Sequence, residues 1–337
     1  MNRLSIKIPI IAAIVTITIT SIGIANMFGL SSDKITYKTG IHESVVSFVA
    51  PDSPAYMANI QIDDTVKSIS GRKFKSIMDM NKNIIERLET GSIAVYEILR
   101  DGETLFVPIQ MTPKYSPNFM FLMTFILILF LFVTNVFYVT FPYRSQFTLL
   151  IYIFYQIITI IIVYSNTNYS VIPLYTVFIL ATSVAPTVVI YLAWSLKKPV
   201  KKIHRLLPIL ISAAVASGWF AGYLFFILSS TNTAFRILIS IVKSVQFILS
   251  LMIILGIKEL ISSISINFKE KNRIFVSYIL SFLIAGFTPF IVLYAIPFIL
   301  GKKEILPVWF AVSFSAIPLL GIIMFNGFFH KIIQKGD

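Results

Sequence analysis

The chain has 337 residues, of which 57% are hydrophobic and only 13% are charged. Soluble domains contain about 45–50% apolar and about 25% charged residues, so the composition excludes an ordinary soluble enzyme and indicates that most of the chain lies in a membrane. There is no cysteine, and the three histidines, His42, His204 and His330, lie far apart. We therefore expect no disulfide, no thiolate nucleophile, no metal and no other cofactor.

The net charge of +13 is unevenly distributed. Residues 31–114 hold 10 basic and 11 acidic residues, whereas the rest of the chain holds 18 basic and 4 acidic residues. The basic residues stand in short runs beside apolar stretches of membrane length, which is typical of loops that face anionic lipid on the cytoplasmic side. We expect membrane lipids as partners and no binding of nucleic acid.

The first apolar segment, residues 8–27, follows a short basic start. Its length matches the roughly 20 residues that cross a bilayer. A cleaved signal peptide is the alternative, but no clear Ala-x-Ala site ends the segment, and it is longer than the about 7–15 apolar residues of a signal peptide. We predict an anchor helix within residues 1–30.

Residues 31–114 carry the signals of one small α+β domain. Alternating β-branched and aromatic residues predict strands, Pro51-Asp52-Ser53-Pro54-Ala55 predicts a turn that leads into a short helix, and Arg100-Asp101-Gly102-Glu103 predicts a hairpin turn. The expected strands are 41–49, 65–70, 92–99 and 104–111, and the expected helices are 55–58 and 76–89. We expect the core to contain Val49, Ile60, Val66, Ile69 and Val95.

This order of elements resembles a bacterial PDZ domain of the kind attached to envelope proteases. The residues that carry the resemblance are Val45, Val49, Ser53-Pro54-Ala55, Ala58, Ile60-Gln61, Asp64, Val66, Ile69, Gly71, Gly91 and Arg100-Asp101-Gly102. Asn59 and Asp63 stand where the family usually has glycine, and Asn tolerates a left-handed backbone.

The resemblance implies a groove that binds an extended peptide as an added strand. The groove would lie between residues 41–47, including Ile41 and Val45, and the helix around Met80 and Ile84. Gly40 would let the backbone turn its amides toward a terminal carboxylate. The alternative is a degenerate PDZ domain that serves as a spacer or a docking surface.

Seven further apolar segments follow residue 114, and we predict a seven-helix bundle over residues 115–330 and a short tail, 331–337. The predicted spans are 118–140, 147–165, 171–195, 207–229, 237–257, 274–299 and 306–328. If the N-terminus is cytoplasmic, 14 Lys and Arg residues lie on the inner side and 4 on the outer side. This bias predicts that both termini are cytoplasmic and that residues 31–114 are extracytoplasmic. The fold class is thus a polytopic α-helical membrane protein with eight transmembrane helices and one extracytoplasmic PDZ-like domain.

The predicted spans carry no Asp or Glu in their central parts, although catalysis or proton transport in a membrane usually needs such groups. His42-Glu43 lacks the second histidine of a zinc-protease motif, since position 46 is valine. We therefore predict that the chain is not an enzyme. Lys243, inside a span, either extends toward the outer surface or contacts an anionic ligand or the PDZ-like domain.

The layout of anchor, external PDZ-like domain and seven spans resembles the sensor half of ComP-type quorum-sensing histidine kinases of bacilli. Weaker points of similarity are Pro113, the run Phe287-Thr288-Pro289-Phe290, and Pro297, Gly301, Pro307 and Pro318. The resemblance implies a receptor for a secreted peptide, with or without a lipid modification. The kinase segment is missing here, so we expect a stand-alone or truncated sensor region, or a partner of a separately encoded kinase.

Two functions remain open. The first is a non-catalytic membrane sensor that binds an extracellular peptide signal and relays it to a cytoplasmic histidine kinase. The second is a PDZ membrane adaptor that recruits envelope proteins to a membrane protease or an assembly machine. A transporter is a more distant third, because the predicted spans lack buried carboxylates.

Overall fold

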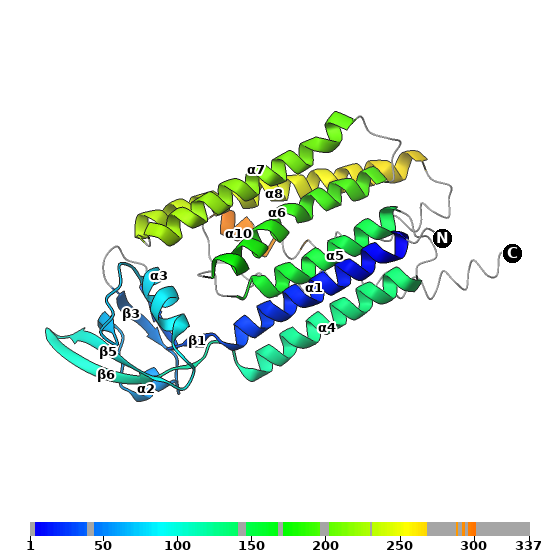
Figure 1. Cartoon of the computed structure of the whole chain (residues 1–337). Helices are drawn as coiled ribbons and strands as arrows, with labels where there is room; N and C mark the ends of the chain where they lie inside the picture. Colours follow the sequence, from blue (N-terminus) through cyan, green and yellow to red (C-terminus); the bar gives the residue numbers. More distant parts are fainter. Residues whose placement is uncertain are drawn as a thin grey trace.

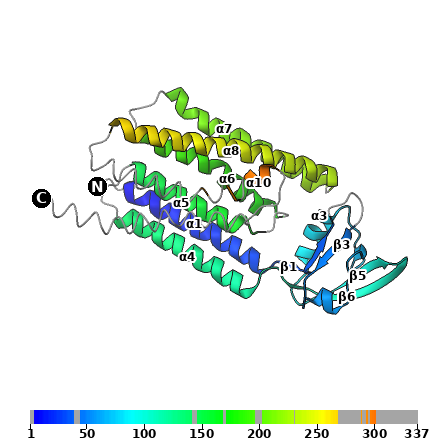
Figure 2. The same ribbon diagram turned by 180° about the vertical axis from the view of Figure 1, so that it is seen from behind.

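The computed structural model describes residues 4–38, 44–140, 146–167, 171–195, 202–229 and 231–267, together with 288, 292–293 and 296–300. Its long helices lie side by side in one bundle, and a small domain built on a β-sheet projects from one end of the bundle (Figures 1 and 2). The domain is inserted between the first and second long helices, so both of its ends connect to the bundle.

Six long helices form the described bundle, namely α1 (Leu4–Phe28), α4 (Pro117–Thr140), α5 (Gln146–Tyr164), α6 (Ile172–Ser195), α7 (Lys202–Ser229) and α8 (Asn232–Asn267). By length and composition, five described segments could cross a membrane: Ile10–Phe28, Pro117–Val136, Ile172–Ser195, Leu206–Ser229 and Thr233–Ser262. The apolar part of α5, Leu149–Tyr164, is shorter. Of the last two predicted spans, 274–299 and 306–328, the structure describes only short pieces around α10 (Ile296–Ile299).

Helix α5 is the centre of the first half of the bundle, where it packs against α1, α4 and α6. Gly23 of α1 permits this close approach, because a Cβ there would lie 2.4 Å from a methyl group of Val163 on α5. Helices α6, α7 and α8 enclose a second apolar core around Trp219 and Tyr223. Gly222 of α7 lies against Ile241 of α8 in the same close manner.

The sheet domain, β1 to β7, contains an antiparallel five-stranded sheet in the order β2-β3-β4-β5-β6. Its strands are β2 (Ile35–Tyr37), β3 (Ser44–Val49), β4 (Thr65–Ile69), β5 (Ile93–Arg100) and β6 (Glu103–Gln110). A second, two-stranded sheet joins β1 (Ser31–Ser32) to β7 (Thr112–Pro113). The four predicted strands are found within a few residues of their expected bounds, whereas β2 was not predicted.

Two helical segments complete the sheet domain. Helix α2 (Pro54–Met57) begins at Ser53, whose side chain accepts a hydrogen bond from the backbone N–H of Tyr56. The second segment runs through α3 (Ile77–Asp79), a π-helical turn η1 (Met80–Ile84) and a 3₁₀ turn η2 (Ile85–Arg87). Its N-cap is Ser76, which accepts from the N–H of Asp79.

The core of the sheet domain confirms the burial predicted for Ile60, Val66 and Ile69, which are at most 4% exposed. The prediction for Val95 was wrong, because its side chain is 42% exposed. Alternate residues of a strand face opposite sides, and on β5 the inward set is Ala94, Tyr96 and Ile98. Val49 is only partly buried and packs at the margin of this core.

The turns of the sheet domain show how the chain accommodates the two positions, Asn59 and Asp63, at which glycine was expected. Asn59 and Asp63 both have positive φ, 61° and 75°, so each adopts the left-handed backbone that glycine favours. The predicted hairpin turn is also present: Arg100 pairs with Glu103, and Asp101 and Gly102 have φ of 52° and 85°. Two successive positive φ values are the signature of the tight turn that matches strand twist.

We predict that Ile69→Ala lowers the unfolding free energy of the sheet domain by about 2–5 kcal/mol, because it leaves a cavity at a fully buried position. Val95→Ala is the matched control and should change it by no more than about 0.5 kcal/mol. The chain has no cysteine, so a fluorophore on Glu103→Cys reports urea unfolding in detergent from one exposed site. Equal effects of the two substitutions would contradict the packing described.

Candidate functional site

The strand expected to receive a peptide, β3, is an inner strand of the sheet. Between Ser44 and Val49 it pairs with β2 on one side and with β4 on the other. The carbonyl of Val45 accepts the N–H of Lys38 at 2.7 Å, and Val45 also pairs with Thr65. Strand addition at Ser44–Ser47 would have to displace β2, so the edge expected at β3 is not open, and the outer strand on that side of the sheet is β2.

The two outer strands of the sheet are β2 and β6, and they differ as docking edges. Pro108 interrupts the edge of β6 and has no N–H to offer to an added strand. Directly before and after β2, the C=O of Lys34 accepts the N–H of Ala50 and the N–H of Lys38 donates to the C=O of Val45 on β3. The register with β3 shifts between Thr36 and Tyr37, but Lys34 and Lys38 are both bonded on the β3 side. Because alternate residues of an antiparallel strand direct these groups to opposite sides, Ile35 and Tyr37 are expected to direct theirs to the open side.

The remaining predicted groove residues do not form an exposed wall. Met80 and Ile84 are 0% and 5% exposed and belong to the core of the sheet domain. They hold the helical segment against the sheet, and a polar substitution at Ile84 would disturb the fold itself. Gly40 and Ile41 lie outside the described residues.

Lys243 belongs to a different part of the molecule. It is partly buried on α8, within the apolar segment Thr233–Ser262, whereas Val45, Met80 and Ile84 belong to the sheet domain. Aromatic rings gather elsewhere in the bundle: Tyr175 on α6 lies 4.5 Å from Tyr223 and 6.2 Å from Trp219 on α7, measured between ring centroids. These rings fill the second core of the bundle.

Asp33, two residues before the start of β2, forms a buried polar centre that sequence reasoning did not identify. Its side chain is 4% exposed overall. One carboxylate oxygen, Oδ1, accepts the N–H of Ile35 at 3.1 Å. The other, Oδ2, accepts the hydroxyls of Tyr37 at 2.7 Å and of Tyr96 at 2.9 Å. The carboxylate thus ties the beginning of the edge strand to the inner face of β5.

Burial dominates the electrostatics of this centre. Removal from water raises the pKa of Asp33 above its usual value, although the hydrogen bonds from Tyr37, Ile35 and Tyr96 oppose that change. Burial also raises the pKa values of both tyrosine hydroxyls, and the nearby Asp33 charge adds to the effect. The pKa of Lys34 is lowered, chiefly by burial.

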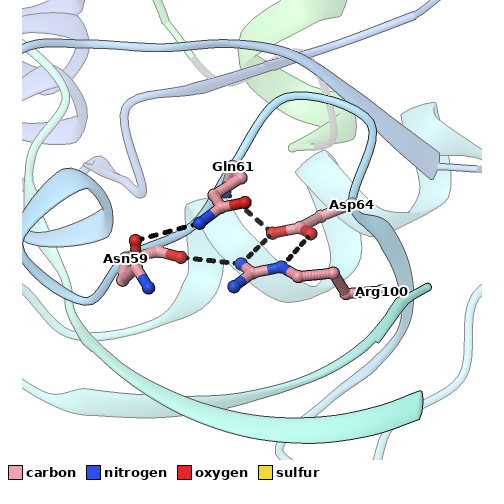
Figure 3. Close-up of polar contacts among 4 residues, drawn as sticks. All are labelled: Asn59, Gln61, Asp64 and Arg100. Atoms are coloured by element: carbon pink, nitrogen blue, oxygen red, sulfur yellow. Dashed lines mark hydrogen bonds and ion pairs between the residues drawn. The ribbon is translucent and has the colours of Figure 1, made fainter.

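A second polar cluster fixes the turn between α2 and β4 (Figure 3). The guanidinium of Arg100 donates two hydrogen bonds of 2.7 Å to the carboxylate of Asp64 and one to the carbonyl of Asn59. The same carboxylate accepts the N–H of Gln61 at 2.8 Å. This cluster holds Asp63, which forms an ion pair with Lys38 at the end of β2.

The two ends of the sheet domain are tied together next to the bundle by the pairing of β1 with β7, here called the junction ribbon (Ser31–Ser32 with Thr112–Pro113). The N–H of Lys114 donates to the carbonyl of Leu30, and the ammonium of Lys34 donates to the carbonyl of Lys114, both at 2.9 Å. Ser31 also donates to the carbonyl of Ile85. The chain segments that enter and leave the domain therefore form one connected unit.

Further contacts connect the junction ribbon to the helices. The ammonium of Lys114 forms an ion pair with Glu86 at 2.6 Å, and this pair joins the ribbon to η2. The hydroxyl of Tyr115 donates to the carbonyl of Asn166, two residues after the end of α5, at 2.8 Å. The ring of Tyr115 stacks on Phe119 in the first turn of α4 with a centroid distance of 4.9 Å. A displacement of the ribbon would therefore act on α1, α4 and the end of α5.

Comparison with protein-family models and with curated proteins finds no match to this chain. Within the described residues, no group of three or more His, Asp and Glu side chains is placed to hold a metal ion. The function must therefore be inferred from the edge strand, the buried carboxylate and the junction ribbon.

We predict an unusual pH dependence for the sheet domain. Because the pKa of Asp33 is raised in the folded state, the unfolded chain loses this proton first as the pH rises above the usual value of 3.8. The stabilisation associated with the protonated carboxyl is full below that pH and is lost as the pH rises through the folded pKa. Asp33→Asn removes the titration and leaves the neighbouring Lys34, Lys114 and Glu86 in place.

The measurement is urea unfolding of the full chain, reported by the fluorophore on Glu103→Cys, between pH 3.5 and 7. The unfolding free energy of the wild type, relative to Asp33→Asn, should fall as the pH rises. A difference that rises with pH would mean that the folded state favours the ionised carboxylate, contrary to the burial described.

Proposed function

We propose that this chain is a non-catalytic membrane sensor region, whose sheet domain lies outside the cell and binds an extended peptide at the edge of β2. Binding shifts the junction ribbon and with it α1 and α4, and the helix bundle passes the change to a cytoplasmic histidine kinase. Both termini are cytoplasmic in this proposal, and the layout is that of the sensor half of ComP-type kinases.

The observation that carries this proposal is the connected junction. The sheet domain has two connections to the bundle, and the junction ribbon pairs them. Tyr115 adds a third contact to the end of α5. A spacer or tether needs only a flexible connection, whereas a relay needs contacts that move helices when the domain changes. The bonds of Lys34 and Lys114 connect the ribbon to the domain, and the bond of Tyr115 connects it to the chain after α5, so together they support a relay.

The edge of β2 supports a peptide as the ligand. Main-chain pairing to a free edge supplies affinity without a particular side-chain sequence. Tyr37 offers both an N–H and a C=O on the open side, and Ile35 offers its C=O, since its N–H is bonded to Asp33. The neighbouring Thr36 and Lys38 have exposed side chains that a peptide could contact.

A second candidate function, the PDZ membrane adaptor, is favoured by a different observation. Helix α2 and the turn after it expose Tyr56, Met57 and Ile62, which are 59%, 74% and 59% exposed. Clusters of exposed apolar residues are common at protein docking surfaces. An adaptor would use this surface to recruit a folded envelope protein to a protease or an assembly machine, and it would not need to move the bundle.

The test places a photoreactive amino acid at Thr36 of β2 or, as a matched control, at the exposed Thr104 of β6, in cells exposed to conditioned growth medium. We expect peptides to be captured at Thr36 and not at Thr104, because only the edge of β2 is free of an interrupting proline. Glu103→Cys should also react with an impermeant thiol reagent in intact cells, since the proposal places the domain outside.

The relay is tested by hydrogen exchange of the full chain in lipid nanodiscs with and without the captured peptide. We expect changed exchange at residues 30–34 and 112–116. Capture of folded proteins in place of peptides, or binding that leaves the junction unchanged, would favour the adaptor. Labelling of Glu103→Cys only after the cells are permeabilised would exclude both functions.

A further inference from the structure

The first backbone N–H on the open side of β2 is already hydrogen-bonded within the chain itself. The N–H of Ile35 is the first backbone group of β2 on that side, and it donates to Oδ1 of Asp33 at 3.1 Å. Asp33 is only 4% exposed, and its other oxygen is bonded to two tyrosine hydroxyls. Release of the Ile35 N–H from Asp33 would therefore leave an oxygen of a buried carboxylate without this partner.

The position of this donor determines which part of a bound peptide would lie beside it. Every described strand pair of the five-stranded sheet is antiparallel. A peptide that extends the sheet in the same sense runs opposite to β2, so its C-terminal end lies at the beginning of β2, beside Ile35 and Asp33. Free backbone N–H groups are what a terminal carboxylate requires at such a place.

We infer that Asp33 acts as an internal substitute for a ligand carboxylate and restricts the β2 edge to internal peptide segments or to peptides without a free C-terminal carboxylate. The Asp33 carboxyl occupies the donor that such a group would need. When it is ionised, it also repels a second negative charge brought next to it. Asp33 is thus a specificity-determining residue, and this inference rests on the proposed binding of a peptide at β2.

The edge retains enough pairing groups for an internal segment. A chain that continues past Asp33 can bond with the C=O of Ile35 and with the N–H and C=O of Tyr37, none of which requires a chain end. Lys38, at the far end of β2, forms an ion pair with Asp63. Binding should therefore depend on the main chain of the peptide and little on the chemistry of its C-terminus.

The experiment uses the full chain in lipid nanodiscs and two phage libraries of the same random decapeptides, one displayed with free C-termini and one displayed within a loop. Selected peptides are synthesised as the acid and as the amide, and photocapture at Thr36 against Thr104 assigns their site. For the wild type, we expect binders from the loop library. Amidation of a selected peptide should change its Kd by less than about threefold, since the N–H of Ile35 is not free to bind a terminal carboxylate.

Two variants separate the hydrogen bond of Asp33 from its charge. Asp33→Ala frees the N–H of Ile35, and free-acid peptides should then bind about tenfold more tightly than their amides. Asp33→Asn keeps an acceptor for that N–H while removing the charge, so it should show no such preference. Each variant is also made in the fluorophore-labelled Glu103→Cys background, where urea unfolding shows whether it is folded. If Asp33→Ala does not fold, the comparison of acid and amide peptides on the wild type tests the role of Asp33.

The outcomes separate this inference from the proposed function. Wild-type binders at β2 that lose more than about tenfold in affinity on amidation would overturn the role of Asp33 and leave peptide binding intact. If neither library yields a binder at Thr36, peptide binding at β2 fails and the inference fails with it.

Discussion

The structure depends on a short pairing of two strands, Ser31–Ser32 with Thr112–Pro113, at the place where the sheet domain meets the helices. Without it the domain would be joined to α1 and α4 by two independent segments. With it, the Lys34 and Lys114 hydrogen bonds join those segments, and the Lys114–Glu86 ion pair extends the connection to the helical side of the domain. The ribbon therefore determines how a change in the domain can reach the bundle.

The same segment also determines the properties of the edge strand, because Asp33 lies between the junction ribbon and β2. Burial of a carboxyl group is unfavourable unless its oxygens are hydrogen-bonded, and here Ile35, Tyr37 and Tyr96 supply the bonds. Asp33 therefore has two effects: it anchors the edge strand β2 to β5, and it occupies the first N–H donor of that edge, the N–H of Ile35. A ligand at β2 would lie only a few residues from the ribbon.

Features that depend on local sequence were predicted well, and features that depend on distant pairing were not. Within the described residues, long apolar runs identified the six long helices, and the Asp101-Gly102 turn identified the β5–β6 hairpin. Strand β2 was missed because it has only three residues, too few for a periodic pattern. The docking edge was misplaced because the neighbours of β3 are set by pairing across the sheet, and the environment of Asp33 depends on Tyr96, 63 residues away.

The most direct test of the account is amide hydrogen exchange of the full chain in lipid nanodiscs at the junction ribbon. The N–H of Lys114, which donates to the carbonyl of Leu30, should be protected to within about tenfold of the amides in the centre of β5, because the ribbon opens only with the domain. Exchange of Lys114 at the rate of an unstructured segment, with β5 still protected, would contradict the connected junction and the relay that is proposed to pass through it.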